Sequence, residues 1–150
     1  MEKNQLKRLP VGIQTFSNII EDGMLYVDKT EYVWRMIHLS KYIFLSRPRR
    51  FGKSLLVSTL QAYFEGRREL FKGLYIDSVE KEWTEYPVLR ISMASGKHME
   101  KDQLERYLLS ILSENERRFG LTSDHPDPNV RLKSLIQNGF SLSSAKVSTS

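Results

Sequence analysis

Between residues 41 and 56 the chain reads Lys41-Tyr-Ile-Phe-Leu-Ser46, then Arg47-Pro-Arg-Arg-Phe-Gly52, then Lys53-Ser-Leu-Leu56. The first run is apolar, aromatic and β-branched, which is typical of a buried strand in a parallel sheet. Pro48 lacks a backbone N–H and cannot easily continue that strand. A helix is predicted from Lys53 to Phe64, with a buried stripe at Leu55, Leu56, Thr59, Leu60 and Tyr63. The sequence therefore predicts a strand, a loop and a helix in direct succession.

On both sides of this stretch, strands and helices are expected to alternate. Short strands are predicted at 24–27 and 87–93, and helices at 15–21, 29–39, 69–74, 100–119 and 129–137. Asp28 is expected to cap the second of these helices with its side chain. The alternation predicts an α/β fold with a mostly parallel sheet. We expect a lead-in segment at 1–28, a partial domain at 29–138 and a disordered serine-rich tail at 139–150.

The loop and the start of the following helix carry the residue types that a triphosphate site needs. A helix N-terminus presents free N–H groups and a partial positive charge to phosphate oxygens. Gly52 lets the backbone approach the phosphates, Lys53 can reach the β- and γ-phosphates, and the Ser54 hydroxyl can ligate Mg²⁺. The usual pattern, G-x-x-x-x-G-K-[ST], is incomplete because Arg47 occupies the first glycine position. A helix that begins with Lys-Ser by chance remains the alternative interpretation.

Positive charge is concentrated in this loop at Arg47, Arg49, Arg50 and Lys53. Guanidinium groups can clamp phosphates bidentately, and they can also contact a nucleic-acid backbone. A third interpretation is a solvated loop whose arginines dock on acidic residues elsewhere. The net charge of +5 over 150 residues is compatible with an anionic partner but does not choose among these interpretations.

The composition excludes several classes of site. The chain has no cysteine, so disulfides and thiolate metal sites are excluded. His38, His98 and His125 lie too far apart in the sequence to suggest a structural zinc site. No apolar run approaches the length of a transmembrane helix, and the N-terminus lacks the apolar core of a signal peptide. We therefore expect a cytoplasmic protein without a membrane partner.

Several longer blocks occur in a recognisable order. They are Leu9-Pro-Val-Gly-Ile-Gln-Thr-Phe16, Leu25-Tyr-Val-Asp-Lys-Thr30, Phe44-Leu-Ser-Arg-Pro-Arg-Arg-Phe-Gly-Lys-Ser-Leu-Leu56, Tyr63-Phe-Glu-Gly66, Leu70-Phe-Lys-Gly73 and Trp83-Thr-Glu-Tyr-Pro-Val88. Together they resemble the N-terminal region of the bacterial AAA-ATPase-like family, over roughly residues 8–137. Members of that family have a P-loop ATPase domain, often followed by a PD-(D/E)XK nuclease-like domain.

The resemblance implies a three-layer α/β/α P-loop fold in which the arginine-rich loop is the family's variant of the Walker A motif. It carries Gly52, Lys53 and Ser54 over as nucleotide-binding residues. The expected ligands are ATP and Mg²⁺, with Ser54 on the metal, and no catalytic residue is assigned. Asp28-Lys29-Thr30 matches a family signature as well. The complete expected site comprises Arg49, Arg50, Phe51, Gly52, Lys53, Ser54 and Leu55.

One departure from the family pattern concerns the Walker B strand, an apolar run followed by Asp-Glu whose acids help to hold Mg²⁺ and position water. Leu74-Tyr-Ile-Asp77 is the nearest imitation in this sequence, and it has a single acid. We therefore expect a truncated family member whose P-loop fold is incomplete because it ends before that strand.

From this departure we expect ATP binding with slow or absent hydrolysis. We also expect marginal stability or association with another chain, because strands that lack neighbours leave apolar surface uncovered. A basic nucleic-acid-binding protein and an inactive fragment of a larger ATPase are the alternative functions.

Overall fold

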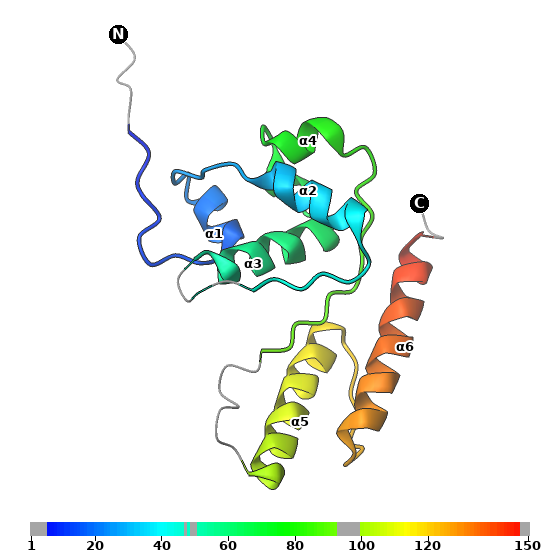
Figure 1. The fold of residues 1–150 in the computed structure, drawn as a ribbon. Helices are drawn as coiled ribbons and strands as arrows, with labels where there is room; N and C mark the ends of the chain where they lie inside the picture. Colours follow the sequence, from blue (N-terminus) through cyan, green and yellow to red (C-terminus); the bar gives the residue numbers. More distant parts are fainter. Residues whose placement is uncertain (1–5, 47, 49–50, 93–99, 148–150) are drawn as a thin grey trace. The chain divides into compact units, whose positions relative to one another are not determined.

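The chain forms two compact units, Met1–Glu85 and Tyr86–Ser150. The computed structural model describes residues 6–46, 48, 51–92 and 100–147. Within these residues every regular element is a helix (Figure 1). None of these helices combines the length and the apolar character needed to span a bilayer.

The first unit consists of α1 (Phe16–Glu21), α2 (Thr30–Leu39), α3 (Lys53–Phe64), the 3₁₀ helix η1 (Arg68–Phe71) and α4 (Tyr75–Val79). The rings of Phe16 and Phe71 meet at the centre, with their centroids 4.8 Å apart. The predicted stripe of α3 is confirmed: Thr59 is buried, and the four apolar or aromatic members pack against the core. The core comprises Phe16, Val33, Ala62, Leu70, Phe71 and Ile76.

The second unit consists of α5 (Lys101–Arg118) and α6 (Pro128–Val147). The Gln103 side chain accepts a hydrogen bond from the Glu100 N–H just before α5. α6 begins with a proline in its first turn, where no N–H is needed, and Asp127 accepts the N–H of Asn129 there. Ile111, Leu112 and Leu135 are buried in this unit.

α6 continues beyond the end that the sequence predicted. A stop was expected at Asn138-Gly139 and disorder from 139 onward, but the helix runs to Val147. Gly139 is buried, and a Cβ at this position would lie 3.6 Å from the Pro87 side chain. This packing offsets the low helix propensity of glycine. Residues 148–150 lie outside the described part of the chain.

The prediction of a three-layer α/β/α fold with a parallel sheet is wrong for the residues that the structure describes. Residues 24–27, 41–46 and 87–92 form no strand, and Met93 lies outside the described residues. The side chains of Tyr42 and Phe44 are 91% and 93% exposed, although the sequence predicted a buried strand there. Composition reports only a preference for extended structure, whereas a strand also requires a neighbouring backbone for its ladder of hydrogen bonds.

The segment predicted as the third strand is held by side chains of α5 instead. The Arg90 N–H donates to Asn115 Oδ1 at 3.4 Å, and Asn115 Nδ2 donates back to the Arg90 carbonyl at 3.3 Å. The Tyr107 hydroxyl donates to the Ser92 carbonyl at 2.7 Å. The amide of Asn115 therefore satisfies both backbone groups of Arg90, as a neighbouring strand would have done.

Candidate functional site

The start of α3 has the backbone geometry of an anion-binding helix terminus. Gly52 has φ 74° and ψ 16°, a left-handed conformation that glycine adopts without strain. The first helical hydrogen bond runs from the Leu56 N–H to the Gly52 carbonyl at 2.9 Å. Gly52 has no side chain that could cap the helix, and the N–H groups of Lys53, Ser54 and Leu55 precede the first helical hydrogen bond, so none of the three has a partner within α3. These N–H groups and the helix dipole together favour a bound anion.

The structure brings four of the expected site residues together at this terminus. Gly52 and Lys53 are exposed and Ser54 is half-buried. Leu55 packs its side chain against the core, so only its backbone N–H can face a ligand. Phe51 precedes them with 63% of its surface exposed. Arg49 and Arg50 lie outside the described residues, and their part in the site stays a prediction.

Gly52→Ala is expected to destabilise the first unit by about 1 kcal/mol, because an alanine Cβ is strained at positive φ. A Cβ at Gly52 would meet no atom within 4 Å, so the loss would come from the backbone alone. Urea unfolding, monitored by tryptophan fluorescence, measures this loss of stability. Gly139→Ala serves as the control and is followed by circular dichroism, because it lies in the second unit: that glycine is helical with ordinary contacts, and alanine should be neutral or stabilising there. Equal stability of Gly52→Ala and the wild type would contradict the strained conformation.

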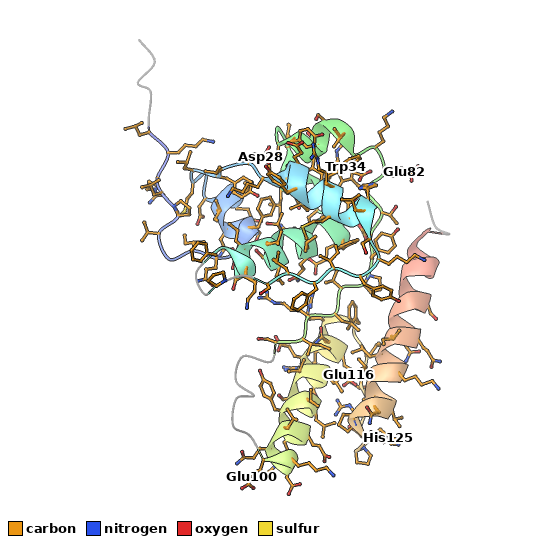
Figure 2. The ribbon with its side chains drawn as sticks, viewed as in Figure 1. Asp28, Trp34, Glu82, Glu100, Glu116 and His125 are labelled. Carbon is orange, nitrogen blue, oxygen red and sulfur yellow. The ribbon has the colours of Figure 1, made fainter. Side chains whose placement is uncertain are left out.

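The signature Asp28-Lys29-Thr30 joins two helices that are distant in the sequence. Asp28 Oδ1 accepts the N–H of Thr30 at 2.8 Å and its hydroxyl at 2.7 Å, so its side chain bonds the first residue of α2 as predicted, although the N-cap position itself is Lys29. Asp28 is labelled in Figure 2. Its Oδ2 accepts the N–H of Tyr75 at 2.7 Å, and the fully buried Thr30 hydroxyl accepts that of Ile76 at 3.1 Å. The same signature therefore caps α4, which no local pattern in the sequence indicates.

The charge of Asp28 is stabilised by these bonds. Partial burial raises the pKa of its carboxyl, but the hydrogen bonds from the Thr30 hydroxyl and from the N–H groups of Tyr75 and Thr30 outweigh burial and lower the pKa below its ordinary value. The negative charge also contributes, after burial, to raising the pKa of the Tyr26 hydroxyl to about 12. Both groups therefore keep their ordinary charge states at neutral pH.

Comparison with known proteins shows which family the chain belongs to. The model of a family described as predicted AAA-ATPase matches residues 10–148. The chain belongs to the AAA-ATPase-like family. An uncharacterized protein encoded in the vnfD 5′ region of Azotobacter chroococcum mcd 1 is 38% identical over 143 residues, which cover 94% of this chain. The AAA-ATPase-like chain spans 28% of that relative's length. No solved structure matches it.

A magnesium ion at this terminus of the AAA-ATPase-like chain would depend on Ser54 and on the phosphates that accompany the ion. In the part of the chain that the structure describes, no group of three or more His, Asp or Glu side chains could hold a metal. Magnesium commonly keeps several waters and binds through substrate phosphates rather than in an all-protein cage. The half-buried Ser54 hydroxyl, in the first turn of α3, fits such a shared site.

Proposed function

We propose that this chain binds ATP, with Mg²⁺, through the N-terminus of α3. The observation that supports it most directly is the left-handed Gly52, which begins the helix and leaves the N–H groups of Lys53, Ser54 and Leu55 without a side-chain cap. The order Gly-Lys-Ser places an ammonium group and a hydroxyl directly beside these donors. Membership of a family described as predicted AAA-ATPase supports a nucleotide as the anion.

In this proposal each residue has a separate task. The three N–H groups hold phosphate oxygens by hydrogen bonds, and the Lys53 ammonium neutralises the charge on the β- and γ-phosphates. The Ser54 hydroxyl orients the phosphates as a metal ligand, and the bound Mg²⁺ supplies further charge neutralisation. The proposal concerns binding alone, and it assigns none of these 150 residues to the hydrolysis of ATP.

Lys53→Ala is expected to weaken Mg-ATP binding roughly ten- to a hundredfold, because hydrogen bonds to charged groups contribute about 1.5–3 kcal/mol. Isothermal titration calorimetry measures the affinity, and circular dichroism establishes that each variant is folded. Ser54→Ala should weaken binding only when Mg²⁺ is present, so its titration is repeated with EDTA. The matched control is Lys72→Ala, which removes the same charge from another exposed lysine of the first unit.

The controls separate a specific site from attraction to a basic chain. An equal loss in Lys53→Ala and Lys72→Ala would indicate diffuse electrostatic binding, which also falls steeply with salt. A folded wild-type chain that shows no saturable heat of binding with Mg-ATP would overturn the proposal. The motif at Gly52, Lys53 and Ser54 would then be a feature shared with the family, and it would not be sufficient for this chain to bind Mg-ATP.

A further inference from the structure

The second turn of α3 contains a buried hydroxyl that joins this helix to the segment before α1. Ser58 is 8% exposed. Its Oγ accepts the N–H of Phe16 at 2.9 Å and shares its own proton between the Leu55 carbonyl at 2.9 Å and the Gln14 carbonyl at 3.3 Å. One side chain therefore contacts both the first turn of α3 and a segment more than forty residues earlier in the chain.

For α1, Ser58 takes the place of a local cap. Phe16 is the first residue of that helix, and the residue before it, Thr15, makes no capping hydrogen bond with its side chain. An uncapped N–H at a buried helix start is costly. Phe16 is completely buried, so its N–H needs a partner from within the protein, and Ser58 supplies it. The start of α1 is thereby fastened to α3.

For α3, the same hydroxyl acts on the turn that carries the free N–H groups. The carbonyl of Leu55 accepts hydrogen bonds from the hydroxyls of Ser58 and Thr59, at 2.9 Å and 2.8 Å. Both hydroxyls lie on the buried side of the helix. The two hydroxyls thus bond the first turn of α3 through its Leu55 carbonyl, on the side of the helix that faces the core. The N–H groups of that turn point the opposite way along the helix axis, toward its N-terminus.

We propose that Ser58 is a positioning residue for the phosphate-binding turn of α3. By bonding Phe16 and Leu55 together, it sets the direction in which the N–H groups of the first turn point. The segment around Gln14, the end of the first family block, is then part of the framework of the site. This inference rests on the proposed binding of Mg-ATP at that turn, and Ser58 itself touches no ligand.

Ser58→Ala is expected to weaken Mg-ATP binding about fivefold, the effect of losing one net hydrogen bond from the framework. Binding is measured by calorimetry at a temperature where circular dichroism shows the variant fully folded. Ser78→Ala is the matched control, because the exposed Ser78 hydroxyl of α4 donates to the carbonyl three residues back in the same way, at 2.6 Å. This control should bind Mg-ATP with the wild-type affinity.

Amide hydrogen exchange provides a readout that does not depend on nucleotide. The Leu56 N–H makes the first helical bond of α3, so it should exchange faster in Ser58→Ala than in the wild type, by a larger factor than the amides of residues 60–64. A merely destabilised unit would instead accelerate both ends of α3 equally through global unfolding. If Ser58→Ala does not fold, Ser58→Cys repeats both measurements with a weaker donor and acceptor of similar size.

The outcomes are distinguishable. Wild-type affinity in a folded Ser58→Ala variant, with uniform exchange along α3, would overturn the positioning role and leave the proposed function standing. A wild-type chain that does not bind Mg-ATP would overturn the proposed function, and the nucleotide part of this inference with it. Selective acceleration at Leu56 together with a fivefold loss of affinity would support the role of Ser58.

Discussion

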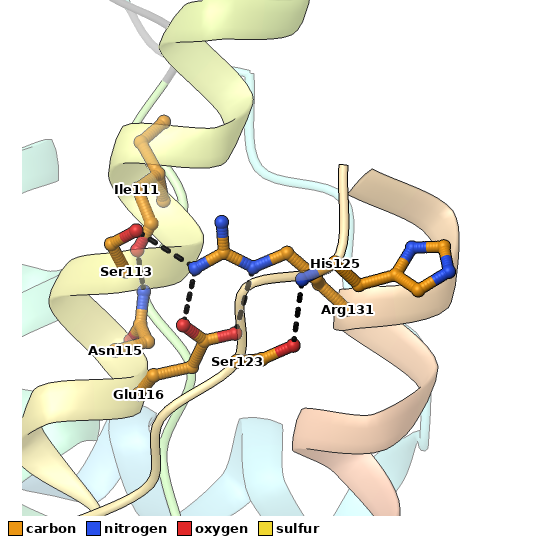
Figure 3. Close-up of polar contacts among 7 residues, drawn as sticks. All are labelled: Ile111, Ser113, Asn115, Glu116, Ser123, His125 and Arg131. Atoms are coloured by element: carbon orange, nitrogen blue, oxygen red, sulfur yellow. Dashed lines mark hydrogen bonds and ion pairs between the residues drawn. The ribbon is translucent and has the colours of Figure 1, made fainter. Parts of the chain in front are cut away.

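Replacing Glu116 with alanine is expected to unfold the second unit or bring it close to unfolding. Arg131 Nε donates to Glu116 Oε1 at 3.0 Å, its Nη2 donates to Glu116 Oε2, and the same nitrogen donates to Ser113 Oγ at 2.8 Å (Figure 3). Glu116 is 4% exposed and Arg131 8% exposed, so neither charge can turn to water.

The size of this effect follows from the charge that would be left behind. The hydrogen bonds that Arg131 donates to Glu116 raise the pKa of Arg131, which stays protonated whether or not its partner is present. Removing one partner of a buried ion pair costs about 3–5 kcal/mol. A single small core rarely supplies more than about 3–5 kcal/mol in total. The loss is therefore comparable to the whole stability of the α5–α6 pair.

The measurement can be made specific to each unit. Both tryptophans of the chain, Trp34 and Trp83, belong to the first unit. Urea unfolding of Glu116→Ala should lose helical circular dichroism at low urea, while the tryptophan fluorescence transition stays near that of the wild type. Glu114→Ala, which removes an exposed carboxylate from the same helix, is the control and should stay within about 0.5 kcal/mol of the wild type.

A double variant tests whether the lone charge causes the loss. Glu116→Leu combined with Arg131→Met replaces both charges by apolar groups, and it should recover most of the stability. A Glu116→Ala variant that unfolds like the wild type would show that the pair contributes little. The explanation by a lone buried charge also requires that the single variants lose stability. A stable double variant beside equally stable single variants would therefore contradict it as well.

Replacing Asp28 with alanine is expected to destabilise the first unit by about 2–3 kcal/mol. Two helix caps are lost, each worth roughly 1 kcal/mol, and the fully buried Thr30 hydroxyl loses its acceptor as well. Tryptophan fluorescence during urea unfolding reports on this unit. Asp22→Ala, at an exposed aspartate after α1, is the control and should have a small effect.

The contribution of Asp28 should also depend on pH. Its pKa is lower in the folded protein than in the unfolded chain, so its stabilising effect is complete above the unfolded value of about 3.9. The effect is lost as the pH falls through the folded value. Asp28→Asn should therefore differ most from the wild type at neutral pH and least in strong acid. A difference that is constant between pH 7 and acid would contradict the assigned charge.

Some features of this protein follow from local sequence. The helix Lys53–Phe64 was predicted with the bounds that the structure has, because its apolar spacing and the preceding glycine act over one or two turns. The loop Gly52-Lys53-Ser54 was identified for the same reason, since Gly52 adopts positive φ where the helix begins. The cap on α2 from Asp28 is likewise a short-range effect, acting two residues along the chain.

The strands were predicted wrongly because their signal is not local. Lys41–Ser46 has the composition of a buried strand, but a strand also depends on partners that are distant in the sequence. In the described residues Tyr42 and Phe44 are exposed instead. Asn115 takes the partner's role for Arg90, and nothing near either residue indicates that pairing. The expectation of marginal stability or association with another chain stays a prediction.

The sequence by itself determined the helix Lys53–Phe64, the Gly-Lys-Ser turn and membership of the AAA-ATPase-like family, because spacing, glycine conformation and characteristic blocks of residues are properties of short segments. Only the tertiary structure decided that Ser58 bonds Phe16, that Asp28 caps α4, and that Glu116 and Arg131 meet between α5 and α6. The physical reason is common to all of these contacts. A buried donor or charge must find a partner, and in a folded chain that partner is chosen by proximity in space rather than along the sequence.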